Sequence, residues 1–382
     1  MTRPRKRIAI SAVLASSALL GIAPSASAQS VVVDEFRFRG PASAADEFIE
    51  LKNTTDTAQD ISGHRVLALQ GSGNASNLLA TIPPGTTLAA RDSYLLAPSG
   101  YTLAGYGVPP EATRDQTYTT NISDNAGVGL FAPLPSTPGS GPCDTNGTTS
   151  AAAPAGRIDA AAFTGAGTQR QCYTEGNAIP AIPTTAGEIA LVRRVANGRP
   201  QDSNDNAGDF RLVATAGTAF SSAAVLGAPG PEARLAPNQS NDTFPASLIF
   251  AGSASDRPNR DFTTGGGGQG ELTIRRRFTN NTGSAVSRLR FRLIRVSTQG
   301  SGTGSADLRA IDSPDETVSG RPVGGTQVED SPPAQPKGGG LNSTFALTTP
   351  QPVASGDSVD VQFRFRAESL GSYTVRFNVE SR

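Results

Sequence analysis

The sequence has few of the residues on which most catalytic and metal centres depend. Its 382 residues include one His, two Cys, no Trp and one Met. One chain of this composition cannot assemble a two-His zinc site, a haem held by two His ligands or a Cys-rich iron–sulfur centre. Any triad of nucleophile, His and acid would have to use His64. These absences argue against most catalytic designs, so we expect a protein that is not an enzyme.

Glycine and proline are abundant instead, with 42 and 28 residues. This content argues against long helices and coiled coils. The 33 basic and 33 acidic residues balance, but four of the basic ones precede the first apolar run, at Arg3, Arg5, Lys6 and Arg7. The remaining chain therefore has 29 basic and 33 acidic residues. It lacks the basic excess typical of DNA binding, so we do not expect a nucleic-acid partner.

The N-terminal segment 1–28 predicts export. A cationic start is followed by an apolar run of about 16 residues and then by Ala26-Ser27-Ala28, the small-residue pattern of a signal-peptide cleavage site. The run is short for a membrane-spanning helix, which needs about 20 residues. We expect cleavage near Ala28 and a secreted, extracellular or periplasmic, monomeric protein without a membrane span. A short N-terminal membrane anchor is the alternative.

The two cysteines fit an oxidising compartment. Cys143 and Cys172 are the only pair in the chain, and the simplest arrangement in an exported protein is one disulfide between them. Such a bond would tie the Pro-, Ser- and Gly-rich segment 133–154 to the region around 168–179. A reactive thiol pair is the alternative, but it would need a basic or helix-terminal environment that the sequence does not indicate.

Apolar and polar residues alternate through most of the chain, as in β-strands with one buried face. Phe36 and Phe38 alternate with charged residues, and so do Leu289, Phe291 and Leu293. The sequence predicts an all-β protein with two β-sandwich domains. The predicted parts are a signal peptide at 1–28, a first sandwich at 29–230, a Pro/Gly/Ala-rich linker at 231–245 and a second sandwich at 246–382.

The order of several motifs in the first domain resembles a lamin-tail domain of the kind found in exported bacterial proteins. The matching segments are 31–38, 46–53, 60–63, 82–88, 202–210 and 227–230. The family usually has a Trp after the glycine that Gly63 matches, and His64 stands there instead. We expect a partly buried imidazole at that position. The resemblance implies an immunoglobulin-like β-sandwich that binds or displays and performs no chemistry.

Two groups of side chains are candidates for a metal site. Asp202, Asn204 and Asn206 offer oxygen ligands at alternating positions, as calcium loops do. The alternative is a structural turn, in which the same side chains bond nearby backbone N–H groups. A second, weaker candidate for Ca²⁺ is the acidic set Asp34, Glu35, Asp46, Glu47 and Glu50. We expect no other cofactor.

Arginines alternate with apolar residues on three predicted strands. Arg288, Arg290 and Arg292 should project from one face, and Arg364, Arg366 and Arg376 repeat the pattern on other strands. If these strands are neighbours in one sheet, the six guanidinium groups form a stripe that could bind a polyanion with sulfate, phosphate or uronate groups. The alternative is a solvated face whose arginines lie beside cross-strand acids. The charge also divides unevenly, with 13 basic and 19 acidic residues in 29–240 and with 16 and 14 in 241–382.

These patterns favour a secreted, non-enzymatic binding protein or a cell-surface-associated structural or interaction protein. Its partner would be an unidentified protein or a surface polysaccharide. A second hypothesis is an accessory Ca²⁺- or polyanion-binding module that serves a separate enzyme. A third is a metal-dependent hydrolase that uses carboxylates, for which no sequence signal selects a pair.

Overall fold

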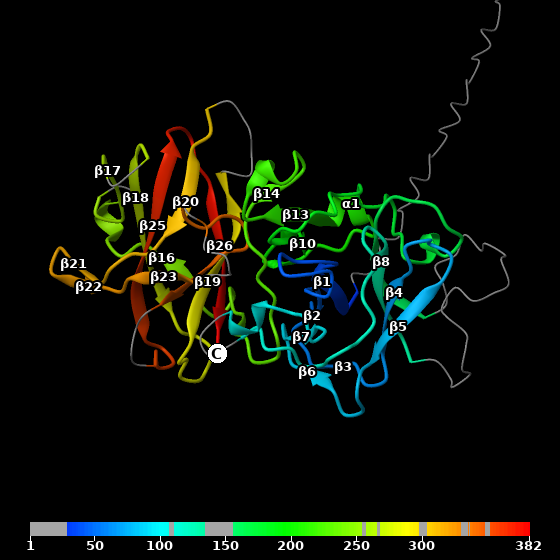
Figure 1. The fold of residues 1–382 in the computed structure, drawn as a ribbon. Helices are drawn as coiled ribbons and strands as arrows, with labels where there is room; N and C mark the ends of the chain where they lie inside the picture. Colours follow the sequence, from blue (N-terminus) through cyan, green and yellow to red (C-terminus); the bar gives the residue numbers. More distant parts are fainter. Residues whose placement is uncertain are drawn as a thin grey trace, which may run out of the picture.

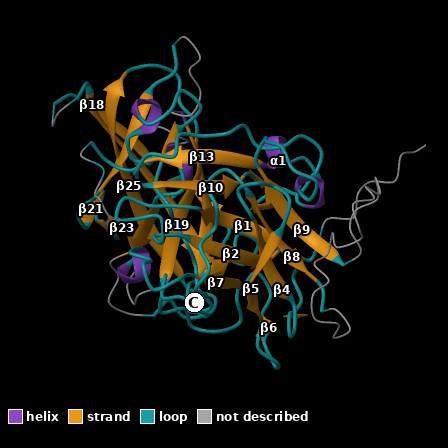
Figure 2. Ribbon diagram, turned by 45° about the vertical axis from the view of Figure 1, so that its right-hand side comes forward, coloured by secondary structure: helices purple, strands orange, loops and turns teal. Residues whose placement is uncertain are grey.

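Strands make up almost all of the regular structure, and the helical segments are short turns (Figure 2). The computed structural model describes residues 29–106, 111–133, 156–253, 257–265, 268–297, 304–329, 335, 337–347 and 352–382. The predicted signal peptide therefore lies outside the described residues, and its cleavage stays a prediction. Cys143 also lies outside them. Cys172 is buried, and its pairing with Cys143 stays a prediction. Within the described part of the chain, no helix is long and apolar enough to cross a membrane.

The first group of sheets forms a β-sandwich. Its larger sheet has the order β14-β13-β10-β1-β2-β7, and its smaller sheet the order β5-β4-β8-β9. The larger sheet contains β1 (Val31–Arg37), β2 (Phe48–Asn53), β7 (Ser93–Leu96), β10 (Ile189–Arg193), β13 (Phe210–Ala214) and β14 (Val225–Leu226). The smaller sheet contains β4 (Arg65–Leu69), β5 (Ser76–Thr81), β8 (Gly127–Phe131) and β9 (Arg157–Ala162). All pairs are antiparallel except β13 with β14.

Short elements complete this domain. They are β3 (Gln59–Asp60) with β6 (Thr87–Leu88), β11 (Val195–Ala196) with β12 (Arg199–Pro200), α1 (Asn206–Asp209), and the 3₁₀ turns η1 (Leu103–Gly105), η2 (Arg170–Cys172) and η3 (Gly217–Ala219). The apolar core between the two sheets includes Val33, Phe36, Leu51, Val66 and Leu130. This core is the burial that the alternating pattern requires.

The second group of sheets forms another sandwich. One sheet has the order β15-β26-β19-β24-β23, and the other contains β16-β18-β25-β20 with β17 also paired to β18. The first contains β15 (Asn238–Gln239), β19 (Leu289–Val296), β23 (Thr326–Glu329), β24 (Thr344–Leu347) and β26 (Val375–Ser381). The second contains β16 (Ala246–Ser247), β17 (Arg260–Thr263), β18 (Gly270–Thr279), β20 (Asp307–Ile311) and β25 (Ser358–Ser369), beside the hairpin β21 (Glu316–Val318) and β22 (Arg321–Val323) and the turn η4 (Ala251–Ser253).

Aromatic rings fill the second core. Phe363 stacks on Phe377 with ring centroids 4.5 Å apart, and Phe291 and Phe345 meet Phe363 edge to face. Such aromatic pairs contribute roughly 0.5–1.5 kcal/mol each beyond their burial. The fold is therefore all-β with two β-sandwich domains, as the sequence predicts.

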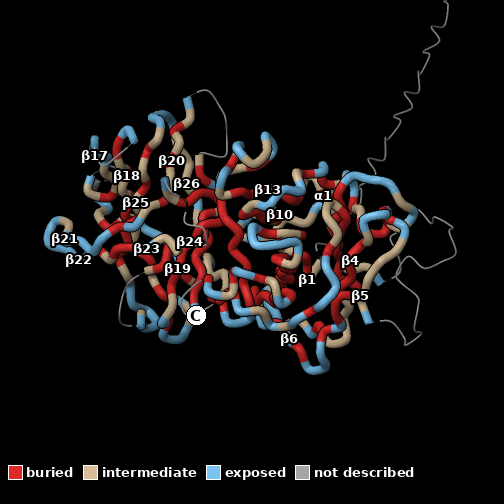
Figure 3. Tube along the Cα trace, viewed as in Figure 1, coloured by how far each residue is buried: buried red, intermediate tan, exposed pale blue. Residues whose placement is uncertain are grey.

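The two sandwiches lie side by side, the first drawn from blue to green and the second from yellow-green to red (Figure 1). The chain between β14 and β15 is not an exposed tether. Residues 227–233 are buried, Gly227 forms a parallel bridge with Leu341 of the second domain, and β15 adds a strand beside β26. Buried positions run along the strands, while exposed positions lie mainly on peripheral loops (Figure 3).

The larger sheet of the first domain is buried on both faces. Every residue of β2 is buried, including the charged Glu50 and Lys52. One face packs into the sandwich core. On the other face Phe48, Leu95 and Tyr106 pack in a second cluster that includes Leu341. The second domain therefore covers a sheet face that is open to solvent in many antiparallel sandwiches.

Candidate functional site

The arginines of β19 lie at the contact between the two domains. Leu289, Phe291 and Leu293 pack in the second core, which places Arg290 and Arg292 on the opposite face. Both arginines are buried, at 0% and 8% exposure. The predicted alternation is therefore correct, but the opposite face meets the first domain and the segment between the domains.

Carboxylates from four segments surround these arginines, and one of them is Glu329 on β23. Arg290 forms ion pairs with Glu111, Glu232 and Glu380. Arg292 contacts Glu232 at 2.5 Å and Glu380 at 2.8 Å, and Arg288 contacts Glu111 at 2.7 Å. The expectation that Arg288, Arg290 and Arg292 form a polyanion-binding surface is wrong, because the protein's own carboxylates already occupy these guanidinium groups.

Glu232 connects the network to the first domain. Its carboxylate also accepts a 2.6 Å hydrogen bond from Lys52. Burial alone would raise the pKa of Glu232, but the charges of Arg292, Lys52 and Arg290 outweigh burial and hold this pKa below its ordinary value. The carboxylate is therefore ionised and bridges both domains.

The other predicted arginines do not extend this group. Arg364 and Arg366 lie on β25, which belongs to the opposite sheet of the second sandwich. Arg376 lies on β26, next to β19, and is exposed. The six arginines therefore do not form a single stripe, because the sandwich places their strands in two sheets.

The predicted acidic set also separates. Glu35 and Glu50 are neighbours across β1 and β2 and face the second domain. Glu35 accepts hydrogen bonds from the Gly230 N–H and from the side chain of Asn342. Elsewhere, Asp46 pairs with Arg37, and Glu47 accepts a 2.9 Å bond from the Ile122 N–H. Asp34 lies close enough to Glu50 for their charges to interact, but Asp46 and Glu47 lie apart from them, so the five acids do not form the single calcium site predicted.

The predicted ligands Asp202, Asn204 and Asn206 do not converge either. The Asn206 Oδ1 accepts the N–H groups of Ala162 and Glu175, both at 3.1 Å, and its Nδ2 donates to the Ala160 carbonyl. This amide is saturated by backbone groups, which agrees with the structural-turn alternative and not with a ligand. His64, for its part, is half-buried, with Nδ1 3.4 Å from the Ser62 carbonyl oxygen.

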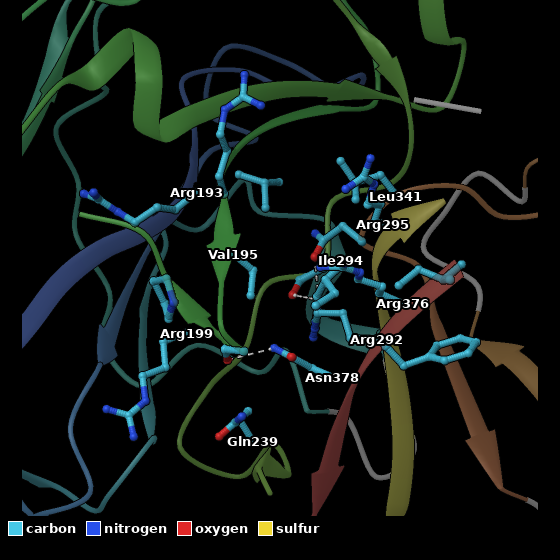
Figure 4. Close-up of a pocket in the computed structure, with 18 of the residues that line it drawn as sticks. Arg193, Val195, Arg199, Gln239, Arg292, Ile294, Arg295, Leu341, Arg376 and Asn378 are labelled. Carbon is cyan, nitrogen blue, oxygen red and sulfur yellow. Dashed lines mark hydrogen bonds between the residues drawn. The ribbon is translucent and has the colours of Figure 1, made fainter. Parts of the chain in front are cut away.

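A cleft of about 870 Å³ opens between the domains, beside the buried network (Figure 4). On the first-domain side it is lined by the end of β10 and by β11 and β12, and on the second-domain side by the end of β19 and by β26. Arginines from both sides surround it: Arg193, Arg194, Arg199, Arg211, Arg292, Arg295 and Arg376. Figure 4 shows Arg193 and Arg199 on one side, and Arg292, Arg295 and Arg376 on the other.

Three of these arginines lack an acidic partner. Within the described ranges, Arg194, Arg295 and Arg376 have no carboxylate within 4 Å, unlike Arg292 deeper in the cleft. The Arg194 Nε is buried without a hydrogen-bond partner. Arg295 and Arg376 are directly opposite each other on β19 and β26. Unpaired guanidinium groups from two domains thus converge on one opening.

Two of these arginines act on the neighbouring Arg211. Burial, and then the charges of Arg194 and Arg295, lower the pKa of Arg211 to about 10. Like charges that gather at a partly desolvated site are unfavourable unless an anion joins them. The cleft is therefore suited to hold an anionic group by forked, charge-assisted hydrogen bonds.

Comparison with known proteins finds a family match for part of the chain. The family model of the Lamin Tail Domain matches residues 24–141, which is less than half of the chain. This segment contains β1 to β8 and supports an immunoglobulin-like first domain. The resemblance predicted for 202–210 and 227–230 lies beyond the match and stays a prediction. No curated protein matches the chain.

Proposed function

We propose that this chain is a secreted, non-enzymatic binding protein whose interdomain cleft holds an acidic polysaccharide. The observation that carries the proposal is the convergence of Arg194, Arg295 and Arg376 on the cleft without acidic partners. The lamin-tail match supports a binding module, because this type of β-sandwich typically performs no chemistry. The sequence predicts polyanion binding along β19. We now propose that binding takes place at the cleft, because the first part of β19 is buried.

The geometry of the cleft favours this ligand class. Its volume of about 870 Å³ lies within the range of roughly 300–1,000 Å³ typical of ligand pockets. Guanidinium forks match the planar carboxylate of a uronate and the oxygens of a sulfate. The side chain of Gln239 also lines the cleft and offers an amide group for a sugar hydroxyl, whereas the amides of Asn241 and Asn378 are hydrogen-bonded to each other.

The proposal is tested by calorimetry with defined oligosaccharides. We expect oligogalacturonate or a heparin-derived oligosaccharide to bind, and neutral dextran not to bind. The double variant Arg295→Ser/Arg376→Ser should weaken binding roughly tenfold or more, because a hydrogen bond to a charged group contributes about 1.5–3 kcal/mol.

The matched control is Arg364→Ser/Arg366→Ser, which removes the same charge from the opposite sheet of the same domain. Binding to this variant should be unchanged. Equal weakening by both double variants would mean that only net charge matters and would reject the cleft. Tighter binding of single-stranded DNA than of any oligosaccharide would reject the ligand class.

A further inference from the structure

Three carboxylates from distant parts of the first domain meet beside Arg193. Asp159 lies on β9, Glu175 follows η2, and Asp202 follows β12. Each offers an oxygen atom, and these oxygens lie within 4.8 Å of one another. Oxygen ligands bind Ca²⁺ at about 2.3–2.6 Å, so two oxygens on opposite sides of one ion lie up to about 5 Å apart. The spacing therefore fits a single shared cation.

Two of the carboxylates each have one oxygen without a partner. The Asp159 Oδ2 accepts hydrogen bonds from the Val33 N–H at 2.6 Å and from Arg193 at 2.7 Å, whereas its Oδ1 has no hydrogen-bond partner. The Glu175 Oε1 lies 3.3 Å from Arg157, whereas its Oε2 has none. The two side chains are 0% and 4% exposed. Buried oxygens without a partner are unfavourable, which points to a missing ligand.

The charges of the surrounding groups indicate the sign and size of that ligand. The carboxylates of Asp159, Glu175, Asp202 and Asp209 face two guanidinium groups, those of Arg157 and Arg193. When all are ionised, this buried group carries two net negative charges. Asp34 also acts on Arg193 and adds to this negative charge, while Lys52, which acts on Asp34, is shared with Glu232 and Glu50. A divalent cation would neutralise the group.

We propose that Asp159, Glu175 and Asp202 form a Ca²⁺ site in the first domain, separate from the anion cleft except that Arg193 borders both. The ligand set differs from the one expected from sequence, because only Asp202 is shared. All-oxygen ligands from separate segments suit Ca²⁺, which accepts irregular geometry and completes its shell with water, better than Mg²⁺. Arg193 lies close by and opposes the cation, so we expect a dissociation constant of about 10⁻⁴–10⁻³ M, as in extracellular modules.

Calorimetric titration of the chelator-treated full chain with CaCl₂ tests the site, with thermal unfolding as the second measurement. We expect saturable binding of one ion and a melting temperature that rises with CaCl₂, because a ligand that binds only the folded state stabilises it. Glu175→Gln and Asp202→Asn should each weaken Ca²⁺ binding at least tenfold and remove the calcium-dependent rise in melting temperature.

Asp205→Asn is the matched control, because Asp205 lies in the same loop but bonds the Asn177 N–H. It should keep both responses. A proton shared by Asp159 and Glu175 is the competing occupant. In that case the original chain would show neither binding nor a thermal response to CaCl₂, and that result would overturn the proposal. An undiminished response in Glu175→Gln would overturn it as well.

Discussion

The contact between the two domains has a closed end and an open end, and both are built with arginine. At the closed end, Arg290 is fully buried and meets four carboxylates, those of Glu111, Glu232, Glu380 and, at 3.9 Å, Glu329. At the open end, a few residues further along β19, Arg295 is exposed and faces Arg376. One residue type therefore has two environments within one strand.

The difference follows from the physical chemistry of buried charge. An arginine can be enclosed only if carboxylates and hydrogen-bond acceptors replace its water, and the closed end supplies these from both domains and from the segment between them. The open end supplies arginines from both domains instead. We interpret the closed end as the element that fixes the two domains relative to each other, and the open end as the element that meets an external anion.

The largest expected effect comes from breaking the closed end. Arg290→Met keeps an unbranched apolar side chain but removes the buried guanidinium group that Glu111, Glu232 and Glu380 share. Removing one member of a buried ion pair typically destabilises by about 3–5 kcal/mol. Urea unfolding should show a loss of this size. Arg295→Met in the same strand should change stability by less than about 1 kcal/mol. Equal losses of unfolding free energy in the two variants would mean that the closed and open ends contribute equally to stability.

A pH dependence of similar size should arise from acids at the same contact. Burial raises the pKa of Glu35 to about 7, although the Gly230 N–H and the charge of Arg292 act in the opposite direction. Below pH 4.5 the folded and unfolded states both carry the proton. Between pH 4.5 and 7 only the unfolded state loses it, so the free energy of unfolding falls as the pH rises. The loss is on the order of 3 kcal/mol for this group.

The measurement is the slope of stability between pH 4.5 and 7. Glu47 and Glu188 add to the slope in the same direction, since burial raises their pKa values to about 8 and about 7. Glu35→Gln should reduce the slope, whatever its effect at a single pH. Glu316→Gln, at an exposed position of the second domain, is the control and should leave the slope intact. A slope that Glu35→Gln does not change would contradict the raised pKa.

The sequence predicts the two faces of each strand but not what covers them. The alternation of Leu289, Phe291 and Leu293 with arginines correctly predicts which side chains enter the second core. Water and a second domain are both compatible with a charged outer face, so the pattern alone could not reveal that Arg290 is buried. The sequence held one signal of complementary surfaces: the first domain has an excess of acidic residues, and the second has a small excess of basic residues.

The candidate sites depended on long-range contacts and on a local irregularity. Strict alternation would put Arg295 on the same face as Leu293, but a β-bulge between them shifts the phase and brings Arg295 opposite Arg376. The acidic run around Asp202 was visible as a local motif. Asp159 and Glu175, which the fold brings next to it, belong to other segments. Short-range spacing could therefore identify one ligand of that group but not its neighbours.

The smallest expected effect has the opposite sign to the first. Because the charge of Arg295 acts on Arg211, and Arg295 has no acidic partner of its own within the described residues, Arg295→Met should raise the free energy of unfolding, by up to about 1 kcal/mol at low salt and without an anion. The gain should vanish near 1 M salt, where screening limits such interactions to about 3 Å. Arg309→Met, which removes an arginine paired with Asp307 at 2.6 Å, should show no gain.

If Arg295→Met instead destabilised the protein at low salt, the open end would be a second structural contact, and the case for an external anion would fail. A gain confined to low salt would mean that the folded protein keeps a repulsive group of arginines at the cleft, as expected of a site completed by its ligand.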